Sequence, residues 1–354
     1  MADEDDLRAK DTLQLSTADS ALRVIDSFRK PSIGGGFLPG APPASHGLRN
    51  LPAAPHSPVT LAPPTSPWTT LDRNTVADDL EAIIRDPRTI YQSNFNLCGP
   101  AAFFNIVAGR HPVAFAQAAA SLFDYGTCSL GFLKIAPDRR LLTKSFAYMC
   151  EKLKGPKDKV APTPPTQGVW MLLSALRNTT KAWWHADWLG DPGQTVAGMT
   201  RPSELKSWFD STGFFSNVLD QTTYLGSSLD GGQPHMRADI DAATNLTLEP
   251  GADHALLIHV NMINQGHQSS VLDQVVDVVT RAFPDHWITL LSKIVVDTTG
   301  ETVTLSVWTW GQTLQLKVPK NVFLSNYYGS VTTKIDAKYA KPDPAPLPSS
   351  PNQA

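Results

Sequence analysis

Residues 91–104 read YQSNFNLCGPAAFF, a polar loop that leads into an apolar helix. The run of apolar residues after the loop has no polar face, which is typical of a helix buried on all sides. Cys98 falls where this helix begins, Gly99 permits close approach beside the sulfur, and Pro100 suits a first helical turn. Free N–H groups and the helix dipole at such a position favour a thiolate over a thiol. We therefore expect Cys98 to be a nucleophile.

Gln92 lies six residues before Cys98. Its side-chain amide can donate a hydrogen bond to an oxyanion beside the Cys98 backbone N–H, and one such donor contributes on the order of 3 kcal/mol. The Gln, the Cys-Gly-Pro-Ala-Ala string and the apolar helix resemble the papain-like cysteine peptidase superfamily, most closely its bacteriocin-leader-peptidase branch and related bacterial effector proteases. The resemblance implies an α+β, papain-like fold, with the nucleophile on a central buried helix that packs on an antiparallel sheet.

The periodicity of the rest of the chain changes from helical to strand-like. In the first half, helices are predicted over residues 75–85, 99–110, 112–123, 139–154, 167–177 and 202–209. In the second half, a helix is predicted over 269–283, and strands over 254–263, 286–296, 301–311 and 314–319. The segment DTTG at 297–300 predicts a hairpin turn. Helices followed by an antiparallel sheet indicate an α+β fold.

A thiol nucleophile needs a base, and the chain has nine histidines. In the resembled family, a His followed by an aromatic or apolar run begins the first strand of a hairpin that faces the cysteine. Residues 285–291 (DHWITLL) fit that pattern, so His286 is the predicted base, and capping of the preceding helix is the alternative. His254 is a competitor, but the strand that carries it and His259 fits the place before the His-bearing strand. Both are expected to be structural, and a metal site with Asp253 is only weakly indicated.

The third residue of a triad is where the sequence departs from the family. The family orients its His with an Asn or Asp near the end of the next strand, whereas residues 307–312 (VWTWGQ) contain no carboxylate. Counting back across the turn places residue 312 or 313 opposite His286. Gln312, Thr309 or a backbone carbonyl is then expected to accept the imidazole N–H, fixing the tautomer but stabilising an imidazolium less than a carboxylate does.

Tryptophans flank the predicted site. Trp287 and Trp310 are candidates for substrate binding, because an indole can exclude water or pack a substrate side chain, with core packing as the alternative. The remaining cysteines, Cys128 and Cys150, have no partner His and are expected to be structural. Three cysteines without a CxxC pair do not indicate zinc or a disulfide framework. We expect neither a metal nor a cofactor.

The composition of the chain predicts its domain boundaries and argues against two kinds of partner, nucleic acids and membranes. Ten of the 29 prolines lie in residues 31–67 and five in 341–354. This predicts a short N-terminal element of helical periodicity (1–30), a flexible Pro/Gly-rich linker (31–69), a catalytic domain (70–340) and a disordered tail (341–354). A net charge of −3 argues against nucleic-acid binding, and no apolar run approaches the roughly 20 residues of a membrane span.

The resemblance implies a cysteine hydrolase that cleaves a peptide or amide bond. Cys98 attacks the carbonyl, His286 transfers the proton, Gln92 and the Cys98 N–H hold the oxyanion, and a thioester acyl-enzyme is hydrolysed. A glutamine deamidase, a transglutaminase or a peptidoglycan amidase would use the same residues, and a catalytically dead scaffold is a further alternative.

The acidic N-terminus lacks a conventional secretion signal. We expect a bacterial effector or toxin secreted by a specialised system, or else a cytoplasmic protein. Its expected partners are a protein or peptide substrate and a cognate immunity or delivery protein.

Overall fold

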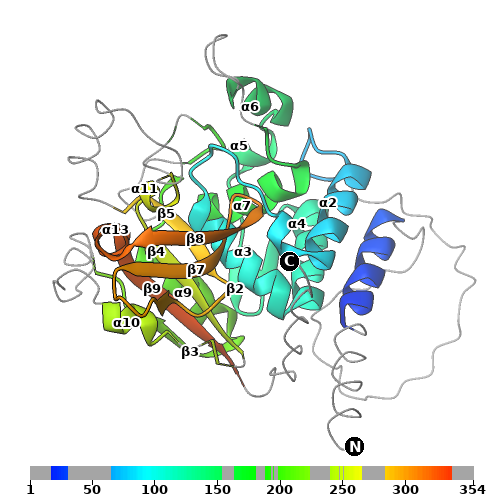
Figure 1. Ribbon diagram of the computed structural model, residues 1–354. Helices are drawn as coiled ribbons and strands as arrows, with labels where there is room; N and C mark the ends of the chain where they lie inside the picture. Colours follow the sequence, from blue (N-terminus) through cyan, green and yellow to red (C-terminus); the bar gives the residue numbers. More distant parts are fainter. Residues whose placement is uncertain are drawn as a thin grey trace, which may run out of the picture.

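The chain folds as an α+β protein in which helices pack against an antiparallel sheet of seven strands (Figure 1). This agrees with the α+β class expected from the sequence. The computed structural model describes residues 17–30, 65–153, 163–180, 188–192, 194, 198–223, 240–246, 248–249, 251–264 and 284–336.

The first half supplies the helical layer. After residue 65, its described helices are α2 (Arg73–Arg85), η1 (Pro87–Thr89), α3 (Cys98–Arg110), α4 (Pro112–Tyr125), α5 (Arg139–Leu142), α6 (Phe146–Leu153), α7 (Gln167–Thr179) and α9 (Pro202–Thr212). A short hairpin between α4 and α5 consists of β1 (Cys128–Leu130) and β2 (Leu133–Ile135).

The second half supplies most of the sheet, whose strand order is β3-β9-β4-β5-β7-β6, with β8 paired to β7. The strands are β3 (Phe215–Asp220), β4 (Ala252–Ile258), β5 (His286–Leu290), β6 (Val295–Val296), β7 (Thr302–Thr309), β8 (Gln312–Pro319) and β9 (Tyr327–Ile335). In the described part of this half, the helices are α10 (Ile240–Thr244), α11 (Asn261–Asn264) and α13 (Lys320–Asn326).

Helix α3 lies at the centre of the molecule. Every residue from Cys98 to Ala108 is buried, and the helix packs against α4, α7, α9 and strand β5. This confirms the buried helix expected from its uniformly apolar sequence. Cys98 is its first residue, as predicted.

The two faces of the sheet pack on different cores because side chains alternate along each strand. On β4, Ala255 and Leu257 belong to the main core with α3, while Leu256 and Ile258 belong to a second core. Residues of α10, α11 and α13 complete that second core. The sheet is therefore covered by helices on both faces along β4.

Several predicted elements differ at their boundaries. The helix expected over 139–154 is two helices, α5 and α6. The chain leaves helical hydrogen bonding after Leu142, and the hydroxyl of Ser145, the residue before α6, accepts from the Tyr148 N–H. The strand expected over 254–263 ends at Ile258 and is followed by α11. The helix expected over 269–283 lies outside the described residues. Strands β3 and β9 were not expected from the sequence.

The strand expected over 286–296 is interrupted between β5 and β6. The Ser292 hydroxyl there accepts a hydrogen bond from the Ser306 N–H in place of a main-chain partner. Pairing of β6 with β7 aligns Val296 with Val303, whereas pairing of β5 with β7 aligns Thr289 with Trp308. The register thus shifts by two residues at the interruption. The pairing of β6 with β7, extended along the strands, would place residue 313 opposite His286, whereas the pairing of β5 with β7 places residue 311 there.

The predicted N-terminal element includes a helix, residues 17–29, that lies beside α2 and α4 (dark blue in Figure 1). Ala21, Ile25 and Phe28 are buried in the main core. Arg29 forms ion pairs with Asp78 and Glu81 on α2. Most of the predicted linker, residues 31–64, and the predicted tail, 341–354, lie outside the described residues.

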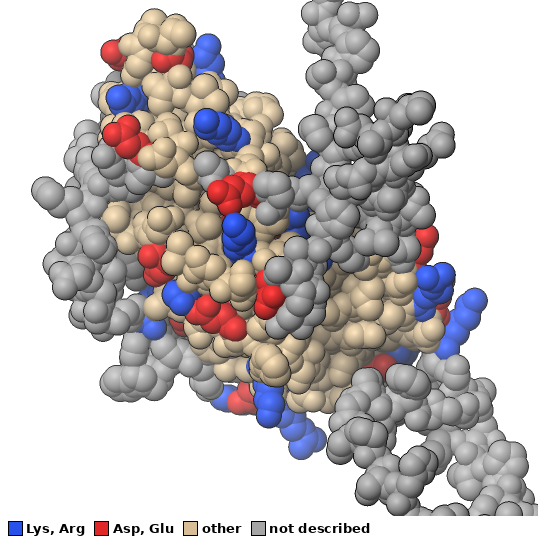
Figure 2. Space-filling model, turned by 90° about the horizontal axis from the view of Figure 1, so that it is seen from below, with Lys and Arg blue, Asp and Glu red and all other residues tan. Residues whose placement is uncertain are grey.

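Charged side chains of both signs are interspersed on the face seen in Figure 2, where Lys and Arg alternate with Asp and Glu. Opposite charges at such spacing leave little net field over that described surface. None of the helices in the described part of the chain combines the length and the apolar character that crossing a membrane requires.

Candidate active site

The loop before α3 delivers Cys98 to the start of the helix through two unusual residues. Ser93 and Asn96 have positive φ angles of 54° and 56°, in the left-handed region that non-glycine residues seldom adopt. Leu97, the residue before the helix, provides no side-chain cap. Main-chain N–H groups at the start of α3 are therefore left for other acceptors, and backbone strain of this kind tends to gather at functional sites.

The sulfur of Cys98 lies against the main chain on both sides of His286. Its Sγ atom is 4.0 Å from the carbonyl oxygen of Asp285, to which the thiol donates, and it accepts from the N–H of Trp287. Helix α3 and strand β5, far apart in sequence, thus meet where Cys98 contacts the main chain of the two neighbours of His286. Among the described residues, the thiol and the imidazole form no direct hydrogen bond.

Burial controls the protonation of the thiol. It raises the pKa of Cys98 to about 11, and the charge of Asp285 acts in the same direction. The N–H groups of Trp287 and Gly99 oppose this rise, because donors stabilise a thiolate. The expectation that the helix start yields a thiolate is corrected: loss of hydration outweighs the helix N-terminus here. Burial likewise raises the pKa of Cys128, to about 12.

His286 is held by its neighbours on β7 and in the following turn. Its Nε2 atom is 2.7 Å from the hydroxyl oxygen of Thr309, and its ring stacks on Trp310 at 4.6 Å between centroids. Burial lowers the pKa of His286 to about 3, so the imidazole is neutral near pH 7. The Nε2 atom is occupied by Thr309, whereas Nδ1 has no hydrogen bond among the described residues.

The turn that carries Trp310 is itself strained. Trp310 and Gly311 have φ angles of 47° and 73° and connect β7 to β8. Positive φ at both central residues is typical of a type I′ hairpin turn, whose twist matches that of the flanking strands. The first central position of such a turn is seldom a tryptophan. The strained position places a half-buried indole on the His286 ring.

Of the two predicted orienting side chains, Thr309 is the one bonded to His286. Gln312 is exposed and begins β8 opposite Thr309 across the turn. The two-residue register shift between β5 and β6 explains the difference, because it puts residue 311, not 312 or 313, level with the histidine.

Three buried polar atoms without hydrogen-bond partners lie in the two segments that flank the start of α3. They are Gln92 Oε1 and Ser93 Oγ in the preceding loop, and Thr200 Oγ1 in the segment before α9. Buried polar groups are nearly always paired, so unpaired ones indicate a place for a further ligand or a stored constraint. Gln92, the predicted oxyanion donor, is 5 % exposed.

Residues 198–200 cover the start of α3. A Cβ atom added to Gly99 would lie 2.3 Å from the Thr200 hydroxyl, and one added to Gly198 would lie 3.0 Å from the carbonyl oxygen of Phe95. The close approach expected at Gly99 is thus an approach by Thr200. Trp287, a predicted substrate-binding residue, is buried and donates from Nε1 to the Thr200 carbonyl at 2.8 Å, so it anchors this segment.

A buried ion pair near the thiol was missed by the sequence analysis. Arg177 on α7 is fully buried, and its guanidinium lies 3.2 Å from Glu204 on α9. Burial lowers the pKa of Arg177, while negative charge on Glu204 or Cys98 raises it. The guanidinium is therefore a cation within electrostatic reach of a thiolate, and an arginine in the apolar run VWMLLSALR was the available signal.

The weakly indicated metal site separates into three different interactions. Asp253 pairs with Arg110 at 2.9 Å, His254 bonds to a hydroxyl of β9, and His259 Nε2 lies 3.7 Å from Asp285. Among the described residues, no three His, Cys, Asp or Glu side chains gather in a way that could bind a metal ion.

Comparisons with known proteins leave the site to be interpreted from its own geometry. No protein-family model, no curated protein and no solved structure matches the chain at a significant level.

Proposed function

We propose that the chain is a papain-like cysteine hydrolase that cleaves a peptide or amide bond through a thioester acyl-enzyme. The observation that carries this proposal is the position of the Cys98 sulfur, at the first residue of a buried helix and against the main chain on both sides of His286. The bond from Thr309 to His286 Nε2 supports it, because it leaves Nδ1 for the proton of the thiol.

The neutral state of both groups defines the first chemical step. As Sγ attacks the carbonyl carbon, the His286 imidazole accepts the thiol proton, so no thiolate has to form beforehand in the buried site. The oxyanion accepts from the Cys98 N–H and the Gln92 side-chain amide. The imidazolium then protonates the leaving amine, and His286 next activates the water that hydrolyses the thioester.

Substrate access requires movement of the segment that covers the sulfur. Cys98 is only 6 % exposed, and Thr200 lies directly beside Gly99. The hydrogen bond from Trp287 to the Thr200 carbonyl holds the segment in place. Displacement of residues 198–200 by a substrate would expose the start of α3 and offer new partners to the unpaired Thr200 hydroxyl and Gln92 amide oxygen.

The biological setting belongs to the same proposal. We infer a bacterial effector or toxin, delivered by a specialised secretion system, that acts on a protein or peptide. Glutamine deamidation, transglutamination and amide cleavage in peptidoglycan use the same thioester chemistry, so the test below distinguishes them by product.

A second candidate, a binding scaffold without catalysis, is favoured by one specific observation. The thiol donates to a carbonyl oxygen, and burial places the pKa values of Cys98 and His286 at about 11 and 3. A charged thiolate–imidazolium pair is therefore disfavoured in the closed structure. The hydrolase proposal requires only neutral partners, which keeps it compatible with this burial.

The proposal is tested by expressing the wild type, Cys98→Ala and Cys128→Ala in the bacterial cytoplasm and, separately, in the periplasm. Mass spectrometry of proteins and wall fragments then detects new termini, deamidated or cross-linked glutamine, and cleaved wall peptides. We expect products from the wild type and from Cys128→Ala, the matched free-cysteine control, and none from Cys98→Ala. Identical profiles for all three proteins would support the scaffold instead.

A further inference from the structure

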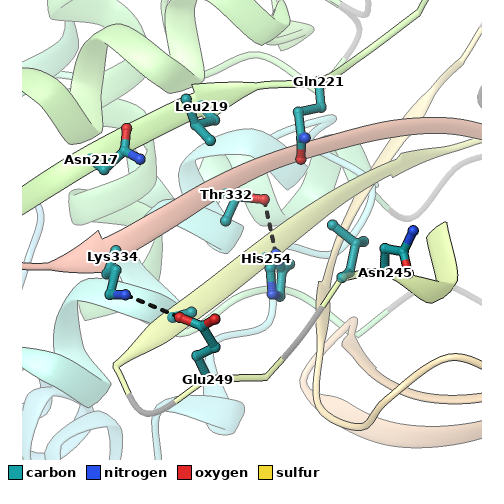
Figure 3. A pocket seen from close by; sticks show the side chains of 10 residues that line it. Asn217, Leu219, Gln221, Asn245, Glu249, His254, Thr332 and Lys334 are labelled. Carbon is teal, nitrogen blue, oxygen red and sulfur yellow. Dashed lines mark hydrogen bonds and ion pairs between the residues drawn. The ribbon is translucent and has the colours of Figure 1, made fainter. Parts of the chain in front are cut away.

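A cavity lies on the face of the sheet that is turned away from α3. It has a volume of about 470 Å³ and is formed over strands β3, β9 and β4, with one wall from the residues that follow α10 (Figure 3). Its volume is within the range of about 300–1,000 Å³ that is usual for small-molecule sites. The lining residues that carry the argument are Asn217, Gln221, Asn245, Glu249, His254 and Lys334.

Strand register assembles the floor of this cavity in two rows. Lys334 on β9 pairs with Asn217 on β3 and with Ala252 on β4. In the next row, Thr332 pairs with Leu219 and His254. Because alternate residues of a strand share one face, these side chains all project toward the cavity (Figure 3).

The opposite face of the same strands is apolar. Val218 on β3, Val331 on β9 and Ala255 on β4 are buried in the main core with α3. Because side chains alternate along each strand, the polar residues point away from this core and take no part in packing against α3. The cavity and Cys98 lie on opposite sides of the sheet.

The polar groups of the cavity are fixed relative to one another. His254 is 2 % exposed, and its Nδ1 atom is 2.9 Å from the Thr332 hydroxyl. Lys334 Nζ lies 3.0 Å from Glu249 Oε2 at the rim. Both side chains are more than half exposed, so the pair itself is weak, but these two opposite charges leave the described lining with little net charge.

The remaining lining consists of three carboxamides and three apolar side chains. Asn217, Gln221 and Asn245 each present a primary amide, which both donates and accepts hydrogen bonds. A ligand whose groups also both donate and accept, such as a polyol, matches three amides and a hydroxyl. Leu219, 45 % exposed beside them, can contact the C–H face of a sugar ring.

We propose that this cavity binds a small neutral saccharide, held by the amides of Asn217, Gln221 and Asn245 over Leu219. With one lysine and one glutamate at its rim, the described lining offers no net charge to select an ion, which is consistent with a neutral ligand. This inference does not depend on the activity of Cys98, because the cavity shares no residue with the candidate active site.

The test is saturation-transfer difference NMR on the full chain with glucose, galactose, N-acetylglucosamine and maltose as probes, and with acetate and methyl phosphate, whose methyl protons are observable, as charged comparators. We expect transfer to at least one neutral sugar and none to the charged probes. Gln221→Ala and Asn245→Ala should each weaken the binding constant by roughly fivefold, the effect of one lost neutral hydrogen bond. Gln315→Ala, an exposed amide on β8, is the matched control and should leave it unchanged.

The melting temperature of each variant shows whether it folds. If Gln221→Ala or Asn245→Ala does not fold, the binding constant of the other variant is sufficient for the test. Absence of transfer to all four sugars overturns the inference. So does sugar binding that both folded variants retain at full strength, or preferential binding of methyl phosphate or acetate.

Discussion

At the scale of single residues, the candidate site depends on how His286 is held. A hydroxyl, not a carboxylate, contacts Nε2, and the stacked Trp310 covers the ring. Sequence pattern was enough to select Cys98 as a candidate, because a helix start is a local feature, whereas His286 was selected from the resemblance to the papain-like peptidases. It could not supply their pKa values, since the burial that sets them comes from segments distant in the chain, such as that of Thr200.

Thr309 is expected to orient the imidazole. Thr309→Val keeps the shape of the side chain but removes the hydroxyl, leaving the buried Nε2 atom without its partner, and should lower kcat/KM about tenfold. Thr309→Ser keeps the hydroxyl and should retain most of the activity. Product formation measured by mass spectrometry under single-turnover conditions checks both variants. Equal losses in the two variants would show that packing of the methyl group, not the hydrogen bond, matters.

At the scale of elements, local periodicity predicted the main helices and the hairpin around DTTG well. It failed where pairing is non-local: β9 lies between β3 and β4, which precede it by long stretches of chain. The register of β5 was also beyond local reasoning, because the shift arises at Ser292, whose hydroxyl replaces a main-chain acceptor. Thr309, and not Gln312, contacts His286 for this reason.

The glycines of α3 provide a test of how closely Thr200 covers the helix start. Gly99→Ala would place a Cβ atom 2.3 Å from the Thr200 side chain, and we expect a loss of about 1–3 kcal/mol in the free energy of unfolding. Gly109→Ala on the same helix meets its nearest atom only at 3.7 Å and should be neutral or stabilising by up to about 1 kcal/mol. Urea denaturation compares the two. Equal stabilities would contradict the tight contact.

At the scale of the whole molecule, the two halves of the chain meet at one place. Helices from the first half carry Cys98, the sheet from the second half carries His286, and α3 packs against β5 between them. The sequence predicted this division correctly. It treated the N-terminal element as separate from the folded body, whereas residues 17–29 pack on it through Ile25 and Phe28. The three buried residues of this helix, Ala21, Ile25 and Phe28, are too few for the sequence alone to indicate where the helix packs.

The central claim is that the imidazole of His286 accepts the proton of the Cys98 thiol, and alkylation of Cys98 as a function of pH tests it most directly. Peptide-level mass spectrometry gives the iodoacetamide rate constant for Cys98 and, in the same sample, for Cys128. Between the pKa of His286, about 3, and that of Cys98, about 11, both groups are neutral. A base-assisted thiol then reacts at a rate independent of pH, whereas an unassisted thiol speeds up about tenfold per pH unit.

We predict that the alkylation rate of Cys98 is independent of pH from pH 5 to 8 in the wild type. In His286→Gln, which keeps a polar side chain in the site, the rate should instead rise about tenfold per pH unit. Cys128 should follow the tenfold dependence in both proteins. If Cys98 follows the same tenfold dependence in the wild type and in His286→Gln, His286 does not serve as its base and the account is contradicted.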